Sequence, residues 1–395
     1  MADNKDKKVL NVPALRFPEF TDEWKKIRLG DNCSIQMCKR IMAAQTNTEG
    51  GVPFYKIGTI GGKADAYISK DLFDEYKRKY SYPNKGEVMI TCAGTVGKCV
   101  IYDGEDSYYQ DSNIVWIDNP NEIISNDFLY HLLSNINWSY LNSTTIVRIY
   151  NDDLRNLKLC CPRLDEQKKI ARFLSLINER IATQNKIIED LRLLSKGIVD
   201  TIFTANKFPK VPFKEIYVRA GEGGTPATSN SEYYDNGTIP FIKIDDLQNK
   251  YIKTNKDCIT ELGLQKSSAW IVPANSIIYS NGATIGAISI NLFPVCTKQG
   301  ILGVVPKADI NVEFLYYFMT STAFTKAVER IVTEGTMRTA YLKDINHILC
   351  PVPCSVKQDE IAKLLSTLSE KLENEVIFQM KLQKQKEFLL SQMFI

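Results

Sequence analysis

The sequence is short of histidine, the residue that enzymes use most often as a general base. Only two histidines, His131 and His347, occur among the 395 residues. They stand far apart, which leaves little room for the Ser/His/Asp or Cys/His groups of hydrolytic enzymes. Each lies beside apolar residues, so we expect both side chains in the core or at its boundary.

The cysteines also lack the spacing of a metal site. There are ten, with no CxxC pair, and Cys33 with Cys38 or Cys350 with Cys354 is more widely spaced than the pairs of a closed zinc site. We therefore expect no metal in this chain and buried free thiols in a reducing cytoplasm. No apolar run reaches the roughly 18 residues of a membrane-spanning helix. The polar N-terminus does not resemble a secretory signal.

Other catalytic motifs are missing too. Ala93-Gly-Thr-Val-Gly-Lys98 lacks the first glycine of a nucleotide-binding loop, and Cys99 stands where a serine or threonine would follow the lysine. Glu75-Tyr-Lys77 and Glu166-Gln-Lys168 have the spacing of some metal nucleases but no suitable upstream aspartate, and no Asn-Pro-Pro-aromatic motif of amino-methyltransferases occurs. We therefore expect a chain that is not an enzyme by itself.

What remains is an ordinary globular composition. The chain is 44% apolar and 24% charged, too apolar for a disordered protein. Its formal net charge is only +3. Any binding to nucleic acid must therefore come from local patches rather than from the overall field.

The chain contains a long internal repeat. Val52-Pro-Phe-Tyr-Lys-Ile57 matches Ile239-Pro-Phe-Ile-Lys-Ile244, and Gly94-Thr-Val-Gly97 matches Ala283-Thr-Ile-Gly286. Further matches follow in the same order: Phe128-Leu-Tyr130 with Phe314-Leu-Tyr316, Cys161-Pro162 with Cys350-Pro351, Ile170-Ala171 with Ile361-Ala362, and Phe203 with Phe394. The offset stays between 186 and 191 residues, far longer than a solenoid repeat, so it indicates two copies of a whole domain.

Each copy begins with a mixed segment and ends with a long helix. The segments Asn84–Thr91 and Ala274–Ser280 are typical of a turn followed by a buried strand, and short helices are expected to start at Phe128 and Phe314. Residues 165–203 and 355–394 then carry apolar side chains at steps of three, four and seven, the pattern of a coiled coil. We predict an α+β fold with domains at 1–162 and 207–352 and long helices at 163–206 and 353–395.

A long helix with one apolar stripe needs a partner that covers it. The simplest arrangement pairs the two helices with each other as an antiparallel coiled coil, with approximate two-fold symmetry between the copies. The alternative is that each helix packs separately on its own domain. A pair of similar domains on a stiff spacer would suit a partner that repeats its features at a fixed distance, as duplex DNA does.

Polar loop residues at matching points of the copies are candidates for contacts with DNA, because Lys, Arg, Thr and Asn are usual donors to phosphates and bases. In the first copy they are Lys39, Arg40, Lys56, Thr59, Thr95, Lys98 and Arg148, and in the second Thr225, Lys243, Asp245, Asn281, Thr284 and Arg338.

Each candidate also has a structural interpretation. The loops could be solvated surface, Asp245 could cap a turn, and the segments 94–98 and 281–286 could be hairpin turns. Arg148 and Arg338 could brace the long helices through Asp153 and Asp344. The glycines at 221–224 would let the backbone approach phosphates closely.

These features together resemble the DNA specificity (S) subunits of type I restriction–modification systems. The resemblance rests on two long helices that begin with Gln167-Lys-Lys-Ile-Ala171 and Gln358-Asp-Glu-Ile-Ala362, and on Arg16–Phe20, Gly223–Pro226 and Ile239–Asp246. It spans nearly the whole chain. The first copy keeps the family's Glu166-Gln167, whereas Lys357 precedes Gln358, and this leaves the start of the second helix open.

The resemblance implies two target recognition domains, each recognising one half of a bipartite site in double-stranded DNA. It implies helices that set the spacer and bind two methyltransferase (M) subunits, with restriction (R) subunits joining the complex. S-adenosylmethionine, ATP and magnesium would sit on those partners, and adenine would be methylated. Two rivals remain: a duplicated nuclease, and a coiled-coil scaffold that binds proteins without DNA recognition.

Overall fold

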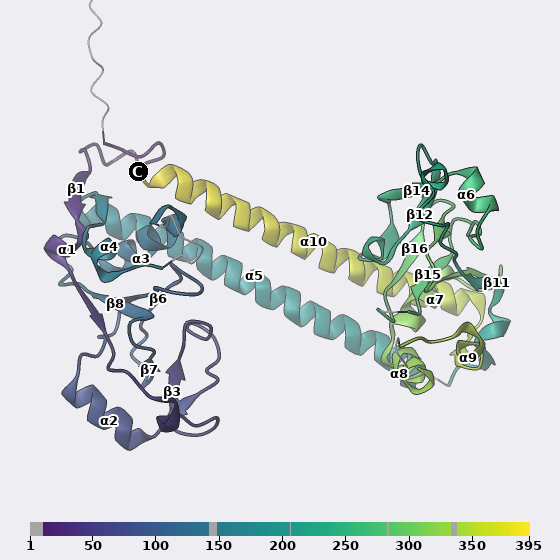
Figure 1. Cartoon of the computed structure of the whole chain (residues 1–395), viewed down its shortest axis with the longest axis horizontal. Coiled ribbons are helices and arrows are strands. Elements are labelled where there is room, and N and C mark those ends of the chain that lie inside the picture. Colours follow the sequence, from purple (N-terminus) through teal and green to yellow (C-terminus); the bar gives the residue numbers. More distant parts are fainter. Residues whose placement is uncertain (1–10, 142–147, 206, 283, 333–337) are drawn as a thin grey trace, which may run out of the picture. The chain divides into compact units, whose positions relative to one another are not determined.

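The computed structural model describes residues 11–141, 148–205, 207–282, 284–332 and 338–395. The chain forms two compact units (Figure 1). Unit 1 comprises the residues up to Gln184 together with Gln379–Ile395, and unit 2 comprises Asn185–Phe378. Each long helix contributes one part to each unit, so this spatial division cuts across the linear order of domains and helices.

Unit 1 is a mixed α+β structure. Its strands are β1 (Lys25–Arg28), β2 (Ser34–Met37), β3 (Val52–Tyr55), β4 (Tyr67–Ile68), β5 (Val88–Thr91), β6 (Cys99–Ile101), β7 (Tyr108–Tyr109), β8 (Ile114–Asp118) and β9 (Lys158–Cys161). Its helices are α1 (Leu29–Asn32), η1 (Ala43–Gln45), α2 (Lys70–Lys79), α3 (Asn126–Asn135), η2 (Trp138–Leu141), α4 (Asn151–Arg155), the first part of α5 (Leu164–Ala205) and the last part of α10 (Ser355–Met393).

Unit 2 repeats this plan. Its strands are β10 (Lys210–Pro212), β11 (Tyr217–Glu222), β12 (Ile239–Ile242), β13 (Tyr251–Ile252), β14 (Asp257–Ile259), β15 (Ile277–Ser280), β16 (Ile288–Asn291), β17 (Cys296–Thr297), β18 (Ile301–Pro306) and β19 (Leu349–Pro351). Its helices are η3 (Phe213–Glu215), η4 (Ser231–Tyr233), η5 (Ile244–Asp246), α6 (Glu261–Gln265), α7 (Val312–Thr320), α8 (Thr322–Ile331), α9 (Leu342–Ile345) and the remaining parts of α5 and α10.

Sheet topology confirms the internal duplication. The main sheet of unit 1 has the strand order β2-β8-β5-β6, and that of unit 2 has β11-β18-β15-β16 with β13 added at one edge. A small sheet, β4-β3-β7 or β14-β12-β17, and a two-stranded ribbon, β1-β9 or β10-β19, accompany each main sheet. Every residue of β5 and β15 is buried, as the sequence predicts for these strands.

The long helices are shared between the units. The core of unit 1 contains Ile170 and Leu174 from the start of α5 together with Leu389 and Met393 from the end of α10. The core of unit 2 contains Val199 and Phe203 from the end of α5 with residues from the start of α10. The helices therefore run in opposite senses, as predicted, and the alternative in which each packs only on its own domain is wrong.

The same aromatic contact closes both helix ends. Phe394, just after α10, lies 5.4 Å from Phe128 of α3, and Phe203, near the end of α5, lies 5.3 Å from Phe314 of α7 (ring centroids). The sequence repeat pairs Phe203 with Phe394 and Phe128 with Phe314. Each helix thus ends on the domain of the other copy.

The helix starts are held by a buried glutamine. The Gln167 side chain accepts a hydrogen bond from Ser125 N (2.8 Å) and donates to the carbonyls of Ile123 (2.8 Å) and Pro162 (2.9 Å). Gln358 repeats all three contacts, accepting from Asn311 N (2.9 Å) and donating to the carbonyls of Asp309 (3.1 Å) and Pro353 (2.9 Å). Both glutamines are almost fully buried, so each long helix is fixed to the loop that begins α3 or α7.

These contacts define the start of the second helix. Pro353 is the counterpart of Pro162, so the sequence match of Cys161-Pro162 with Cys350-Pro351 is out of register by two residues. The glutamate that differs between the copies has a separate task. Glu166 accepts two hydrogen bonds of 2.7 Å from Arg16, and one of 3.3 Å from the Trp24 indole. Glu166 thereby holds the N-terminal segment rather than the helix itself. The second helix, which has Lys357 at this position, can therefore begin without a glutamate.

The two histidines have different environments. His131 is buried, with Nε2 3.3 Å from Ser175 Oγ, and its burial and the Lys386 charge lower its pKa to about 4. His347 is exposed, so its expected place in the core is wrong. The turn after α9 directs it outward, although Ile348 beside it is buried. All ten cysteines are free thiols, six of them buried.

We expect Gln167→Ala to destabilise unit 1 by about 2–4 kcal/mol, because it leaves one buried N–H and two carbonyls without partners. Urea unfolding followed by tryptophan fluorescence measures this, since Trp24, Trp116 and Trp138 lie in unit 1 and Trp270 is in unit 2. The control Gln383→Ala removes an exposed amide of α10 and should change stability by less than about 0.5 kcal/mol. Equal effects of the two substitutions would show that the hydrogen bonds of Gln167 do not stabilise unit 1.

His131 should make the unfolding free energy depend on pH. Its pKa is about 4 when folded and about 6.5 when unfolded. Above pH 6.5 both states are neutral and the stability is complete; between pH 6.5 and 4 the unfolded state binds the proton first, so stability falls by up to about 3 kcal/mol. We expect His131→Gln to remove this component, so that the unfolding free energy of the variant depends less steeply on pH than that of the parent. The unfolding free energies are measured by urea unfolding of both proteins between pH 4 and 6.5. The same dependence on pH in parent and variant would contradict the assignment.

Candidate nucleic-acid interface

The candidate site of unit 1 is built around the segment Gln110–Asn113, which follows β7. Strand β7 runs parallel to β3, so the residues that follow the two strands lie at the same edge. Gln110 N donates to Tyr55 O at 2.9 Å, and Cys92 N donates to Asn113 O at 2.8 Å. Both ends of this segment, which we call the 110–113 segment, are therefore pinned, one to β3 and the other to the residue that follows β5.

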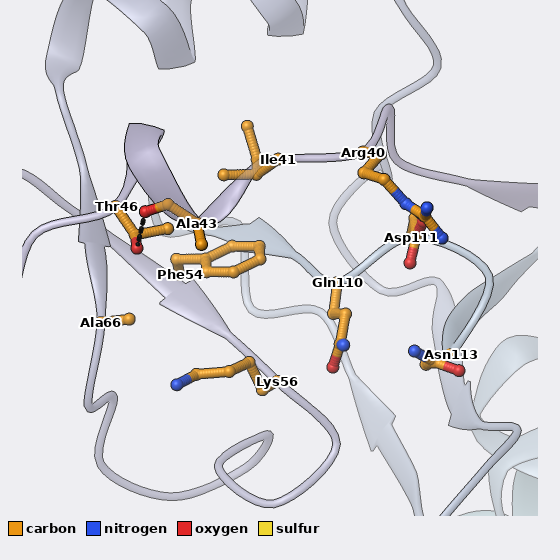
Figure 2. A pocket seen from close by; sticks show the side chains of 10 residues that line it. All are labelled: Arg40, Ile41, Ala43, Thr46, Phe54, Lys56, Ala66, Gln110, Asp111 and Asn113. Atoms are coloured by element: carbon orange, nitrogen blue, oxygen red, sulfur yellow. Dashed lines mark hydrogen bonds and ion pairs between the residues drawn. The ribbon is translucent and has the colours of Figure 1, made fainter.

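Three predicted cations gather around the 110–113 segment. Arg40 forms an ion pair with Asp111 at 2.5 Å, and Arg148 Nη2 donates to Ser112 Oγ at 3.5 Å. Arg40 and Lys56 line one pocket of about 310 Å³ together with Gln110, Asp111 and Asn113. Figure 2 shows the Arg40 guanidinium directed toward Asp111, with Gln110 and Asn113 on the same wall of the pocket.

Unit 2 has an equivalent arrangement with different side chains. The 298–301 segment follows β17, which runs parallel to β12, and Lys298 N donates to Ile242 O at 3.0 Å. Thr225 Oγ1 accepts from Gln299 N at 3.4 Å, so Thr225 meets this segment where Arg40 meets the segment of unit 1. Lys298 and Gln299 are exposed.

The lysines after β3 and β12 share one local design. Lys56 pairs with Asp65 at 3.0 Å, and Lys243 with Asp257 at 2.9 Å. Thr59 Oγ1 accepts from Lys56 N (3.0 Å), just as Asp246 Oδ2 accepts from Lys243 N (2.9 Å). Thr59 therefore caps its own turn. In unit 2 the cap is Asp246, and the predicted Asp245 remains exposed.

The hairpin between β5 and β6 carries Thr95 and Lys98, both exposed. Lys98 Nζ donates to Ile60 O at 2.5 Å and so joins this hairpin to the turn that follows Lys56. Lys39 lies with its ammonium 5.4 Å from the centre of the Tyr80 ring. Asp153 does not brace Arg148 but accepts from Tyr150 N at 2.7 Å at the start of α4.

In unit 2, Thr284 and Arg338 line a second pocket of about 320 Å³ together with Glu329. Asn281, in contrast, does not fit a role in DNA contact. It is fully buried, and its amide donates to Glu222 Oε1 (2.6 Å) and Ala340 O (3.1 Å). Asn281 thus holds the β15 hairpin against its neighbours. The repeat residue Ala283 lies outside the described part of the chain.

The glycines of the Gly223–Pro226 stretch serve packing inside the protein rather than an approach to phosphate. A Cβ atom on Gly223 would lie 1.7 Å from Thr297 O, and one on Gly224 would lie 2.3 Å from Ser268 Oγ. The backbone therefore passes too close to β17 at Gly223, and too close to Ser268 and Ala269 at Gly224, for any side chain. This close passage places Thr225 beside the 298–301 segment.

Sequence reasoning missed Gln110 and Asn113 in unit 1, and Lys298 and Gln299 in unit 2. Strands β7 and β17 have only two residues each, so the sequence carries no signal that marks the positions after them. Behind the site, Tyr109 stacks on Tyr55 at 5.8 Å, and burial raises the pKa of Tyr109 above its usual range.

Within the described ranges, no three His, Cys, Asp or Glu side chains are grouped to hold a metal ion. Among the helices described, none has the length and hydropathy needed to cross a membrane.

Comparison with known proteins agrees with the duplicated architecture. The family model described as type I restriction modification DNA specificity domain matches residues 21–193 and again residues 211–381. A putative type I restriction enzyme MjaX specificity subunit of Methanocaldococcus jannaschii is 25% identical over 92% of this chain and 91% of its own length.

A putative type I restriction enzyme specificity subunit of Haemophilus influenzae, S.HindORF215P, is 50% identical over 173 residues. That match covers 44% of each chain, so the chain aligns with less than half of this relative. Among solved structures, the S subunit of a type I restriction–modification system from M. genitalium shares the fold, with a TM-score of 0.60 at 17% identity over 97% of this chain and 99% of its own.

We expect Gly223→Ala to destabilise unit 2 by about 2–3 kcal/mol, because the added methyl group collides with a backbone carbonyl that cannot move independently. Thermal unfolding followed by circular dichroism measures the change. The control is Gly58→Ala, at a loop glycine with open space around its Cβ position, which should shift stability by less than about 0.5 kcal/mol. An unchanged melting temperature for Gly223→Ala would show that the packing explanation is wrong.

Proposed function

The chain belongs to the type I restriction–modification DNA specificity family, and on this premise we propose that each unit recognises one half of a bipartite site in double-stranded DNA. The observation that carries the proposal is the duplication itself. The two units have the same strand order and the same pinned segment after β7 or β17, but different side chains at the exposed positions. A shared framework with different contact residues suits recognition of two different half-sites.

The long helices suit the role of a spacer. A helix of 42 residues such as α5 is about 60 Å long, and each helix is held at its start by a buried glutamine and at its end by a phenylalanine. Apolar side chains also remain exposed on both helices, including Leu176, Leu193, Leu194, Leu364 and Met380. We assign this exposed apolar surface to binding two methyltransferase subunits.

We assign the catalytic reactions to the methyltransferase and restriction subunits. S-adenosylmethionine would be bound by the methyltransferase subunits, which would methylate adenine, and ATP and magnesium would serve the restriction subunits. This chain would supply sequence recognition alone, consistent with its lack of catalytic motifs. A duplicated nuclease would need such a motif, and the likenesses described above give no support to a scaffold without DNA recognition.

The proposal is tested by sequencing DNA methylation in the host with and without this gene. We expect a bipartite methylated motif that disappears on deletion and returns when the gene is restored. Exchange of residues 13–160 for those of a related chain should then change one half of the motif and leave the other half and the spacer unchanged. A motif that persists without the gene, or an exchange that changes both halves, would reject the assignment.

A further inference from the structure

The Asn113 side chain is placed to make a contact outside the protein. It lines the 310 Å³ pocket of unit 1 and is half-buried. The described residues give its amide no hydrogen-bond partner, although its backbone carbonyl is held by Cys92 N. The next residue, Ile114, is fully buried at the start of β8. The backbone of Asn113 is thus fixed while its amide is open to a ligand.

The neighbouring charges suit a nucleic acid. Arg40 and Arg148 approach the same segment through Asp111 and Ser112, and Lys56 lies across the pocket. Cations at the rim of an interface commonly contact phosphates and set the register of the protein on DNA. The amide of Asn113, which stands among these cations, would then face the bases.

Gln110 lines the same pocket but is already engaged inside the protein. Its Oε1 accepts a hydrogen bond from Ile57 N at 3.3 Å, and this contact fixes the amide against the turn after β3. Asn113 has both an acceptor and a donor available. A side-chain amide with both groups free can pair with the N6 amino group and N7 of adenine in the major groove.

Comparison of the two units also singles out this position. The backbone contact that anchors the segment is repeated, as are the turn caps and the lysine–aspartate pairs described above. The side chains differ. The last residue of β5 pairs with Ile114 and the last residue of β15 pairs with Ile301, so Asn113 corresponds to Gly300, whose carbonyl accepts a hydrogen bond from Asn281 N at 3.1 Å. The anchoring backbone contact is thus the same in the two units, but unit 2 has a glycine, without a side chain, where unit 1 has Asn113.

We propose that Asn113 determines base specificity in unit 1 by pairing with the major-groove edge of an adenine. This inference rests on the proposed function, since it assumes that unit 1 recognises one half-site. The half-site of unit 1, identified by the exchange of residues 13–160, must then contain an A·T pair whose recognition depends on this one amide.

The test uses a host strain that lacks the gene and is complemented with the parent chain, Asn113→Ala, Asn113→Asp or the surface control Gln383→Ala. DNA methylation is then sequenced. We expect Asn113→Ala to lower discrimination at one A·T position of the unit 1 half-site about 5- to 100-fold, with the other half-site unchanged. Asn113→Asp, which keeps the shape but loses the donor, should also lose the preference for adenine. Gln383→Ala should leave the motif unaltered.

Each outcome decides the question. If both Asn113 variants methylate only the parental motif, the inference is wrong while the proposed function stands. If the parent chain gives no bipartite motif, the proposed function fails and the inference fails with it. If Asn113→Ala abolishes methylation altogether, Asn113→Asp decides: a relaxed adenine position supports the inference, and an unchanged motif or complete loss in a chain that still unfolds cooperatively overturns it.

Discussion

The hydrogen bonds of Gln167 and Gln358 are the constraint on which the architecture depends. A helix of about 40 residues with one apolar stripe is stable in water only if the stripe is covered and the direction of the helix is set. The two glutamines set that direction at the point where each helix leaves its domain, and Phe203 and Phe394 secure the far ends. Because each helix is anchored in both copies, neither domain has a complete core without the other half of the chain.

The duplication within one chain separates framework from function. Some contacts occur in both units, such as the hydrogen bonds of Gln167 and Gln358 and the turn caps beside Lys56 and Lys243. These contacts are explained by folding alone. Contacts found in one unit need a local reason. Glu166 has one, since it binds the Arg16 segment. The ion pair of Arg40 and Asp111 has another, since it shapes the pocket edge of unit 1, where unit 2 has Thr225 and Gln299 instead.

The sequence predicts the large features of the fold because periodicity carries them. The helices α5 and α10, the buried strands β5 and β15 and the duplication all follow from patterns that extend over many residues. Single polar residues were predicted less well, because exposure is decided by packing between distant segments. Asn281 belongs to a polar turn yet is buried against β11, and His347 lies beside Ile348 yet points outward. Asn113 follows a strand of only two residues, which is too short to leave a pattern.

The Arg40–Asp111 pair illustrates how the site can be specific without adding stability. Arg40 is 68% exposed, and an exposed ion pair contributes little to folding, typically less than about 1 kcal/mol. Its effect is instead to restrict a long, flexible side chain to one direction before any ligand arrives. A side chain that is already ordered loses less entropy on binding. The same reasoning applies to the pinned backbone of the 110–113 segment, so the hydrogen-bonding groups of the site are held in place before a ligand binds. A wrong base would then leave one of these groups unpaired and would be rejected.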